Sequence, residues 1–360
     1  MSRPSQSPDF VEGAMGSGYA RHSQVQRDAG SYGMPYLHRA LEQVPLPQDG
    51  SPFRAADLGA AAGTNSMEPL RAVVDGVRVR AGYELPVAVV HTDIAGNDFN
   101  ALFSTIHGSP DSYAHRPGVH AYVASGSFYG PLFPPAELHL VWSAIAVQWL
   151  SRLPTVAHDH IYSSGADPDT RRALREQSRS DWEVFLTHRA AELRPAGRMV
   201  ILGGAAADDG SSGAEGLMDT ANGVFVELVE QGLLDADEHA RMMIPTWNRT
   251  LGEFLAPLRA EPLERDLSLE EHSLVALPDI LLEEYHATRD AEHFGNRVAG
   301  FFEAAFGPSL FSALSPGSRS SEAVAEVMTE FRTRLAARAA ADPGAVETHW
   351  HMALLRIVRR

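Results

Sequence analysis

Along the chain, segments with the apolar pattern of strands alternate with segments that have the apolar spacing of helices. Short apolar runs predict buried strands at residues 53–58, 87–91, 122–124, 138–146 and 198–202. Helical spacing of apolar residues predicts helices at about 66–80, from residue 97 onward, and at about 169–193. Because strands and helices alternate, we expect an α/β fold built on a doubly wound parallel sheet.

The pattern changes after Gly204. Residues 205–216 are small and polar, which indicates a linker, and residues 217–312 read as several helices with no clear strand. A basic, alanine-rich helix is expected at 331–341, and residues 348–358 alternate enough to form a terminal strand that returns to the sheet. We therefore expect a flexible arm or lid over residues 1–30, a core over 31–204 and 313–360, and a helical cap over 205–312.

Composition narrows the class of protein. The chain has 360 residues, of which 44% are hydrophobic, and this is enough for a large core. It contains no cysteine, which excludes disulfides, zinc–thiolate sites, iron–sulfur clusters and a thiol nucleophile. The formal net charge of -16, with no basic cluster interleaved with aromatic residues, argues against a nucleic-acid partner.

Nothing in the sequence indicates export or insertion into a membrane. Residues 1–23 contain no apolar stretch of the kind found in secretory signals. The most apolar segment, 138–150, is too short to span a bilayer and is interrupted by Ser143 and Gln148. We therefore expect a cytoplasmic protein without a membrane partner.

Residues 53–66 carry the most informative motif. They read as a strand, a turn and the start of a helix, with Asp57, Gly59 and Gly63 in the pattern D-x-G-x-x-x-G. Such a turn presents backbone N–H groups and the positive end of a helix to a ligand. A carboxylate stands where a dinucleotide fingerprint has its first glycine, which disfavours an NAD-dependent oxidoreductase. It favours S-adenosylmethionine (SAM), whose ammonium can face a carboxylate. The same pattern also fits a tight turn in another α/β protein.

Two later strand ends fit the same nucleoside. Asp93 ends the second strand, where a carboxylate can accept hydrogen bonds from both ribose hydroxyls, although a strand-end Asp also caps turns. Residues 126–130 read Gly-Ser-Phe-Tyr-Gly and follow the third strand. They offer a backbone N–H and an aromatic face to an adenine ring, or they form an ordinary aromatic loop.

These ordered motifs resemble the SABATH family of SAM-dependent carboxyl methyltransferases, named for salicylate, benzoate and theobromine enzymes. Four segments are similar in order, at 56–66, 97–100, 126–139 and 148–154. Residues 19–26 are similar to the family's Y-A-x-N-S-x-x-Q arm, and residues 244–247 to an Ile-Pro step in its cap. The similarity is dense over the first 155 residues and thin over the cap, and the chain looks like a bacterial member.

The resemblance implies a Rossmann-like SAM-dependent methyltransferase sheet with an α-helical cap, and a homodimer. It places Tyr19, Ser23, Asp57, Gly59, Asn65, Asp93, Ile94, Ser127 and Phe128 around SAM. It places Gln26, Ile145, Gln148, Trp149, Met218 and Trp247 around the substrate. The Gln26 amide and the Trp149 indole N–H would be neutral donors to a substrate carboxylate. Taken alone, Gln26 also fits a solvated arm, and Trp149 fits a core position.

This chain departs from the family pattern at several positions. Ile145 stands where the family has a Tyr, and Met218 where it has a cap Trp, which indicates a pocket that is less aromatic on two sides. Glu12 replaces a Lys of some members and would disfavour an anionic substrate if it reached the pocket. The loop after Pro154 lacks the family's Asn-Lys-Gly pattern, so the Mg²⁺ ion of some members stays open. The Ala-His-Asp-His sequence at 157–160 fits a solvated loop better than a metal site.

The reaction implied by the resemblance is an in-line displacement in which a carboxylate oxygen attacks the sulfonium methyl carbon. A carboxylic acid is ionised at pH 7, so no residue is expected to act as an acid, a base or a covalent nucleophile. The expected substrate is a small aromatic or apolar acid, and the products are a methyl ester and S-adenosylhomocysteine. Two alternatives stay open: N-methylation of a xanthine-like heteroaromatic, and SAM binding without catalysis.

Overall fold

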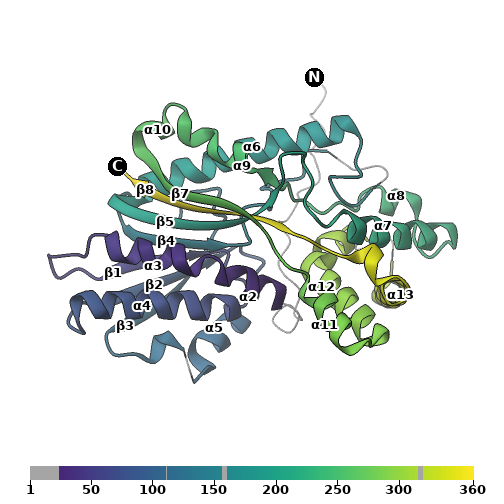
Figure 1. Ribbon diagram of the computed structural model, residues 1–360, viewed down its shortest axis with the longest axis horizontal. Coiled ribbons are helices and arrows are strands. Elements are labelled where there is room, and N and C mark those ends of the chain that lie inside the picture. Colours follow the sequence, from purple (N-terminus) through teal and green to yellow (C-terminus); the bar gives the residue numbers. More distant parts are fainter. Residues whose placement is uncertain (1–23, 111, 156–159, 315–318) are drawn as a thin grey trace.

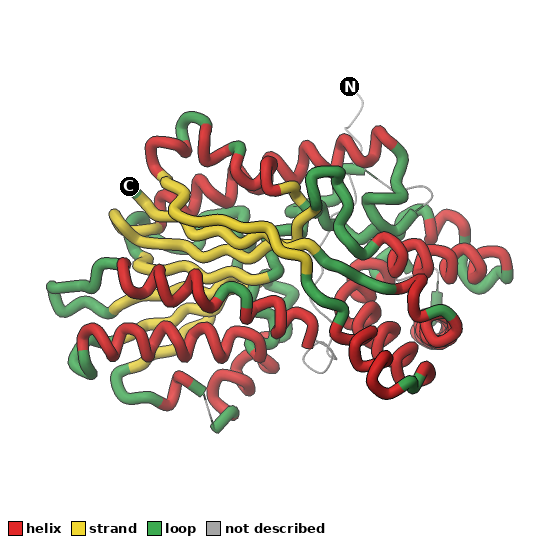
Figure 2. Tube along the Cα trace, in the orientation of Figure 1, coloured by secondary structure: helices red, strands yellow, loops and turns green. Residues whose placement is uncertain are grey.

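A computed structural model describes residues 24–110, 112–155, 160–314 and 319–360, with the backbone alone for 24–27. Its strands gather in one half of the molecule, and the other half consists of helices and loops (Figures 1 and 2). The strands are β1 (Phe53–Leu58), β2 (Val87–Asp93), β3 (Val119–Ser125), β4 (Leu138–Ala144), β5 (Leu193–Ala206), β6 (Arg249–Thr250), β7 (Leu267–Ala276) and β8 (His351–Arg359). The predicted α/β class is confirmed.

The sheet is mixed, with the strand order β3-β2-β1-β4-β5-β8-β7 and β6 paired to the end of β5. The strands from β3 to β5 in this order are parallel, whereas β8 runs antiparallel to both β5 and β7. The expectation of an entirely parallel sheet is therefore corrected at one edge. The terminal strand does return to the sheet, as predicted, and it lies between β5 and β7.

Two strand boundaries differ from the prediction for local reasons. β4 ends at Ala144, two residues early, because Ile145 adopts a left-handed φ of 55°. β5 begins at Leu193, which pairs with Leu138. Residues 194–197 then loop out before the pairing resumes at Arg198, so the predicted helix-stop segment is a bulge within the strand.

The residues that the structure describes contain twelve α-helices. They are α2 (Gln24–Ser31), α3 (Met34–Gln43), α4 (Met67–Ala81), α5 (Phe99–Gly108), α6 (Pro168–Glu192), α7 (Glu215–Glu230), α8 (Ala236–His239), α9 (Leu251–Leu255), α10 (Leu263–Asp266), α11 (Ile280–Thr288), α12 (Ala291–Phe311) and α13 (Ser321–Ala341). Side-chain caps start several of them, as where Asp98 accepts from the Ala101 N–H at 3.0 Å.

Helices cover both faces of the sheet. Alternate residues of one strand serve opposite cores: Val200 packs in the cluster with α3 and α4, and Ile201 packs in the cluster with α6 and α9. Figure 1 shows α3 and α4 in front of the sheet. Strands that are buried on both faces read as continuous apolar runs, and this is why the sequence predicted them well.

The strand β7 lies within residues 217–312, where the sequence predicts no clear strand, so that prediction is wrong. A β-bulge and two consecutive glutamates interrupt the alternation of its residues. Glu270 forms ion pairs with Arg198 of β5 at 2.9 Å and with Arg356 of β8 at 3.1 Å. The strand is therefore held by charged partners from distant segments, which its local pattern does not reveal.

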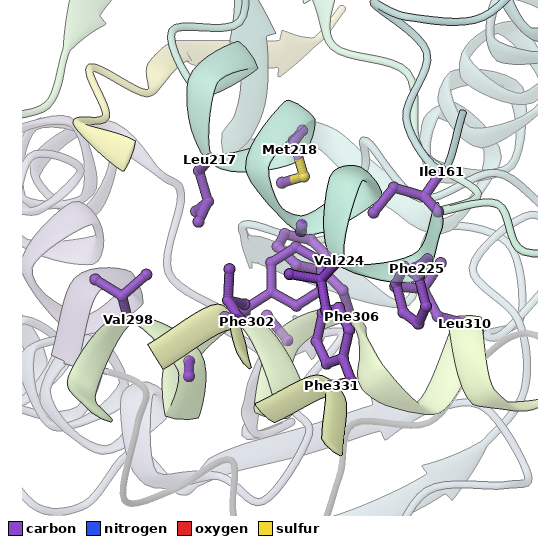
Figure 3. Packing of buried hydrophobic residues seen from close by; sticks show 14 of the residues in the cluster. Ile161, Leu217, Met218, Val224, Phe225, Val298, Phe302, Phe306, Leu310 and Phe331 are labelled. Carbon is purple, nitrogen blue, oxygen red and sulfur yellow. The ribbon is translucent and has the colours of Figure 1, made fainter. Parts of the chain in front are cut away.

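The helical half has its own core between α7, α12 and α13. Figure 3 shows Phe225, Phe302, Phe306 and Phe331 gathered between these helices. The rings of Phe225 and Phe331 stack with their centroids 4.2 Å apart. The helix α13 thus packs with the cap helices, although the sequence predicts residues 313–360 to belong to the core. Conversely, β7 belongs to the sheet, although the sequence predicts residues 205–312 to form the cap. The division of the chain into domains stays a proposal.

We expect Phe331→Ala to lower the free energy of unfolding by about 3–5 kcal/mol, because it leaves a cavity between three helices. The matched control is Phe103→Ala, since Phe103 is 46% exposed. Its expected cost is below about 1 kcal/mol. Urea unfolding followed by circular dichroism measures both, and equal losses would contradict the position of Phe331 in the cap core.

Candidate active site

The turn between β1 and the short helix at Thr64–Ser66 forms a first cavity. Gly59 and Gly63 have φ angles of +83° and +79°, which glycine adopts without strain. A Cβ atom on Gly59 would lie 2.7 Å from the Cβ of Ala146. The backbone therefore passes close to the segment after β4, and a cavity of about 40 Å³ remains beside the turn.

This first cavity lies where the strand order changes direction, because β1 has β2 on one side and β4 on the other. In open α/β sheets, ligands bind outside the carboxyl ends of the strands at such a point. The cavity is lined by Gly30, Asp57, residues 59–66, Trp142, Ala144 and Ile145. The structure thus brings together three predicted cofactor residues, Asp57, Gly59 and Asn65.

Asp57 is buried and contacts a buried histidine of β2. The Nδ1 atom of His91 lies 2.8 Å from Oδ2 of Asp57, and because a carboxylate only accepts, Nδ1 carries a proton. The Nε2 atom of His91 contacts the hydroxyl of Tyr113. Burial raises the pKa of Tyr113 well above its usual range, so the phenol keeps its proton. These three side chains form a hydrogen-bonded chain that fixes the orientation of Asp57.

The Asp93 side chain, at the end of β2, hydrogen bonds to the turn that follows β1. Its Oδ2 atom accepts from the Ala61 N–H at 2.6 Å, and its Oδ1 atom accepts from the Ile94 N–H at 2.8 Å. Burial raises the pKa of Asp93 to about 6, against the effect of these two hydrogen bonds. Asn97 adds a bond from its Nδ2 to the Ala61 carbonyl oxygen at 2.9 Å. The predicted residues Asp93 and Ile94 therefore sit beside the turn that carries Asp57.

The loop after β3 carries Ser127 and Phe128 to the same place. The Gly126 N–H donates to the Asp93 carbonyl oxygen at 2.9 Å, and the Ser127 hydroxyl accepts from the Tyr129 N–H at 3.3 Å. The Phe128 ring approaches within 3.8 Å of the position that a Gly59 Cβ would occupy. The edge of the Phe128 ring thus lies beside the turn that follows β1.

A buried ion pair in α6, which the sequence reading missed, holds this loop. Arg189 donates to the carbonyl oxygens of Phe128 at 2.7 Å and Gly130 at 3.0 Å. Glu192 accepts from the Leu132 N–H at 2.7 Å and pairs with Arg189 at 2.8 Å. Oppositely charged residues three or four positions apart are common on exposed helices. The spacing of Arg189 and Glu192 therefore gives no signal that this pair is buried.

Ile145, at the end of β4, borders two cavities. It lines the first cavity and also a second one of about 90 Å³. Its N–H donates to the Leu202 carbonyl oxygen at 2.8 Å, which fixes the backbone there. A group that moves between ligands in the two cavities would therefore pass this residue.

The second cavity has mostly apolar walls. It is lined by Ala29, Ile145, Gln148, Trp149, Tyr162, Gly204, Thr246, Asn248, Leu277, Phe301, Ala305, Phe306, Trp350, His351 and Met352. Three predicted substrate residues, Ile145, Gln148 and Trp149, are among them. The amide of Gln148 bonds to protein backbone, donating to Ile145 O at 3.1 Å and accepting from Gly204 N–H at 3.2 Å. These two bonds use one of the two N–H donors and one of the two acceptor positions of the Gln148 amide.

Buried charged side chains hold the turn at residues 147–151 from both ends. Arg249 donates to the Val147 carbonyl oxygen at 2.6 Å, and Asp181 accepts from the Ser151 N–H at 2.8 Å. Burial lowers the pKa of Arg249, and the Asp181 carboxylate opposes that change. The two opposite charges fix the turn without making direct contact with the cavity.

Tyr129 contacts the same turn. Its hydroxyl contacts the carbonyl oxygen of Trp149, and the ring of its neighbour Phe128 packs against Phe185 of α6 with centroids 5.7 Å apart. The indole of Trp149 packs against Phe306 of α12, with ring centroids 6.4 Å apart. Within the described residues, no side chain or carbonyl accepts from the indole N–H. Trp149 can thus present a donor to a ligand.

Met218 and Trp247 are described by the structure and line neither of these cavities. Met218 is fully buried among the cap helices (Figure 3). Trp247 lines a separate polar cavity and its indole N–H lies 3.4 Å from Glu253 Oε2. Tyr19 and Ser23 lie outside the described residues. Gln26 lies in α2, and its side chain is not among the described groups. Further along the same helix, Gly30 lines the first cavity and Ala29 lines the second.

Several residues that line the second cavity were missed, notably Tyr162, Asn248, Phe306, Trp350 and His351. They come from the loop before α6, the segment after α8, the helix α12 and the start of β8. The alternating sequence at the C-terminus predicts a strand there. It does not tell which strand end meets the cavity, because that depends on the antiparallel pairing with β5.

No group of three or more potential metal-ligating side chains occurs within the ranges that the structure describes. His158 and Asp159 of the candidate metal motif lie outside those ranges. The Nε2 atom of the third residue, His160, lies 3.2 Å from the Oδ1 atom of Asp219. In the same described ranges, no helix is both long and apolar enough to cross a bilayer.

Comparison with known sequences assigns the family. A family model described as "SAM dependent carboxyl methyltransferase" matches residues 6–355, nearly the whole chain. The protein therefore belongs to the family of SAM-dependent carboxyl methyltransferases, in agreement with the SABATH resemblance.

Curated relatives include enzymes of two acceptor classes. The chain is 31% identical over 232 residues to a Theobroma cacao protein named probable 7-methylxanthine methyltransferase 3 (59% of this chain and 63% of that one). It is 29% identical over 263 residues to indole-3-acetate O-methyltransferase 1 (66% and 68%) and 26% identical over 361 residues to gibberellic acid methyltransferase 1 (90% and 90%), both of Arabidopsis thaliana. The chain thus spans less than two thirds of the length of the first of these relatives.

Among solved structures, the chain is similar to a loganic acid methyltransferase solved with SAH. The TM-score is 0.75 at 20% sequence identity, and the match covers 99% of each chain. This similarity shows that the two proteins share a fold, so the predicted Rossmann-like methyltransferase sheet with a helical cap is confirmed.

We expect Gly59→Ala to weaken SAM binding at least tenfold and to lower the melting temperature, because its Cβ meets Ala146 at a left-handed φ. The control is Gly50→Ala, which has a similar φ of +79° and nothing within 4 Å of the added Cβ. Calorimetric titration and thermal unfolding measure both variants. If both behaved alike, the close approach of the turn to Ala146 would be of no consequence.

Proposed function

We propose that this protein transfers the methyl group of SAM to the carboxylate of a small, apolar or aromatic acid and releases a methyl ester and S-adenosylhomocysteine. The observation that carries the proposal is the position of Ile145, which borders both the cavity beside the glycine turn and the apolar cavity that contains Trp149. Family membership supports the reaction type, and two curated relatives are named as methyltransferases of acids.

In this proposal SAM occupies the first cavity. Asp93 would accept from the ribose hydroxyls, and Phe128 would face the adenine ring with Ser127 beside it. Asp57, Gly59 and Asn65, which line this cavity, would complete the surroundings of the nucleoside and the amino acid moiety, together with Ile94 beside Asp93. Tyr19 and Ser23 are proposed only from the family resemblance.

The acid would occupy the second cavity with its carboxylate near the indole N–H of Trp149. A second donor, the amide of Gln26, is proposed from the family resemblance. Neutral donors orient an anion without requiring a second buried charge. The substrate oxygen is ionised at neutral pH, so the protein needs to align it with the methyl carbon and exclude water. We assign no residue to general acid–base catalysis and no metal to the reaction.

A second candidate function is methylation of a heteroaromatic ring nitrogen. It is favoured by the relatives named as xanthine methyltransferases, one of which is 29% identical over 325 residues and comes from Camellia sinensis. In that case Trp149 would donate to a ring carbonyl oxygen.

A bacterial origin and a homodimer remain predictions from the sequence.

Methyl transfer from labelled SAM tests the proposal. The protein is incubated with small carboxylic acids, phenols and xanthines, and each labelled product is treated with mild base. Base-labile label is expected, because a methyl ester hydrolyses. Base-stable label would favour the second candidate, and SAM binding without any transferred label would contradict both enzymatic functions.

Trp149→Phe is expected to raise KM for the acid about tenfold or more, because the indole N–H donor is lost from a largely apolar cavity. The dissociation constant of SAM is expected to change less than about twofold. Trp247→Phe is the matched control, since Trp247 does not line this cavity. Initial-rate kinetics and SAM titration measure these effects. Similar kinetic losses in the two variants would remove Trp149 from the substrate site.

SAM affinity is expected to depend on pH through Asp93. Because the ribose hydroxyls donate to the ionised carboxylate, affinity is full above the pKa of about 6 and falls as the pH drops through it. Asp93→Asn is expected to bind SAM at least tenfold more weakly at pH 7.5 and to lose this dependence. The control, Asp98→Asn, changes an exposed carboxylate that caps α5. A wild-type affinity that is constant between pH 5 and 7.5 would contradict the role of Asp93.

A further inference from the structure

A carboxylate that the protein leaves half paired lines the first cavity. Asp57 belongs to the lining, and its Oδ2 atom accepts from Nδ1 of His91 at 2.8 Å. Its other oxygen, Oδ1, accepts no hydrogen bond from any described residue and retains accessible surface. By contrast, Asp93 uses both of its oxygens to accept backbone N–H groups. Asp57 therefore offers an oxygen that a ligand can reach.

The register of the sheet places His91 beside Asp57. The two residues are direct neighbours in the parallel pair of β1 and β2, so their side chains project from the same face of the sheet. Tyr113 begins the short 3-10 helix η2 (Tyr113–His115), and its hydroxyl reaches the other nitrogen of the imidazole. Both His91 and Tyr113 are 0% exposed. Water therefore does not compete for the hydrogen bonds between these side chains.

The hydrogen bonds of Tyr113 determine the charge of His91. The phenol keeps its proton, and among the described residues the atom placed to accept that proton is Nε2 of His91. A nitrogen that accepts a hydrogen bond carries no proton, so the imidazole is neutral and its one N–H is on Nδ1. An imidazolium would have donors on both nitrogens and would leave the buried phenol without an acceptor.

A neutral imidazole leaves the charge of Asp57 uncompensated. Within the described ranges, His91 is the one basic side chain at ion-pair distance from this carboxylate. A buried carboxylate whose partner is a neutral donor is costly, and a cationic ligand recovers that cost. The amino acid moiety of SAM carries an ammonium, which is a cation and also a hydrogen-bond donor. The charge of His91 therefore determines how strongly Asp57 attracts this group.

We propose that His91 is a positioning residue that holds Asp57 as a charged acceptor for the ammonium of the cofactor, and that the Tyr113 hydroxyl supports this role by keeping the imidazole neutral. His91 is fully buried and acts through Asp57. The inference rests on the placement of SAM in the first cavity, which belongs to the proposed function. It adds a selectivity, because such a site favours adenosine derivatives that carry an ammonium over those that lack one.

The test compares two ligands that differ in the ammonium alone. They are S-adenosylhomocysteine and its deamino analogue, in which hydrogen replaces the ammonium. Calorimetric titration measures the dissociation constant of each ligand, and it does not depend on turnover. The wild-type protein is expected to bind S-adenosylhomocysteine about ten- to a hundredfold more tightly than the analogue, which is the range for a hydrogen bond between charged groups.

Three variants separate positioning from a general structural role. His91→Leu is expected to reduce this preference about fivefold or more, with a change of less than about twofold for the deamino analogue, because the carboxylate loses the donor that orients it. His91→Asn is expected to keep most of the preference, since its amide nitrogen is bonded to Cγ as Nδ1 of histidine is. The control is His120→Leu, an exposed histidine of the adjacent strand β3, which is expected to match the wild type.

The charge of His91 is tested in the wild-type protein itself, so this measurement decides even if His91→Leu does not fold. The protein is labelled with nitrogen-15 at its histidines, and its NMR spectrum is recorded without ligand at pH 7.5. The His91 signals are those that disappear in His91→Asn. We expect a proton on Nδ1 and none on Nε2, whereas protons on both nitrogens would overturn the inference.

The outcomes distinguish this inference from the proposed function. Equal weakening of both ligands by His91→Leu would show a general structural role and overturn the inference, while the proposed function would stand. Equal binding of the two ligands by the wild-type protein would do the same. Failure of the wild-type protein to bind S-adenosylhomocysteine would overturn the proposed function and the inference together.

Discussion

Buried charged side chains hold the turns that form both cavities. Arg189 and Glu192 fix the loop that carries Phe128, and Arg249 and Asp181 fix the turn that carries Trp149. Burying such charges is costly, and removing one partner of a buried pair typically costs about 3–5 kcal/mol. Each of these groups bonds to backbone atoms of the turns, and Arg189 and Glu192 also pair with each other. They make the positions of the ligand-facing residues depend on the packing of α6 against the sheet.

The sequence predicts the parts of the fold that are determined locally. The buried strands have continuous apolar runs, and the turn after β1 needs glycine where φ is positive, so both were readable from residues such as Val89 and Gly59. The ends of adjacent parallel strands meet at one edge, which is why Asp57 and Asp93 could be expected together. The structure places them side by side in the same group of turns.

The rest depends on pairings between distant segments. β7 escaped prediction because Glu270 interrupts its pattern, and its partners lie in β5 and β8. His351 escaped because only the antiparallel pairing of β8 brings that strand end to the cavity. Met218 was assigned to the substrate on a thin alignment, and its helix instead buries it in the cap core. In each case the missing information concerns which elements are neighbours.

The central claim is that SAM and the acid occupy two cavities that meet at Ile145. The most direct measurement is a crystal structure with S-adenosylhomocysteine and a substrate acid bound. We predict the sulfur of S-adenosylhomocysteine beside Ile145, the ribose on Asp93, and the carboxylate within hydrogen-bond distance of the Trp149 indole nitrogen. A nucleoside bound outside the turn at 59–66, or an acid bound in the polar cavity beside Trp247, would contradict the account.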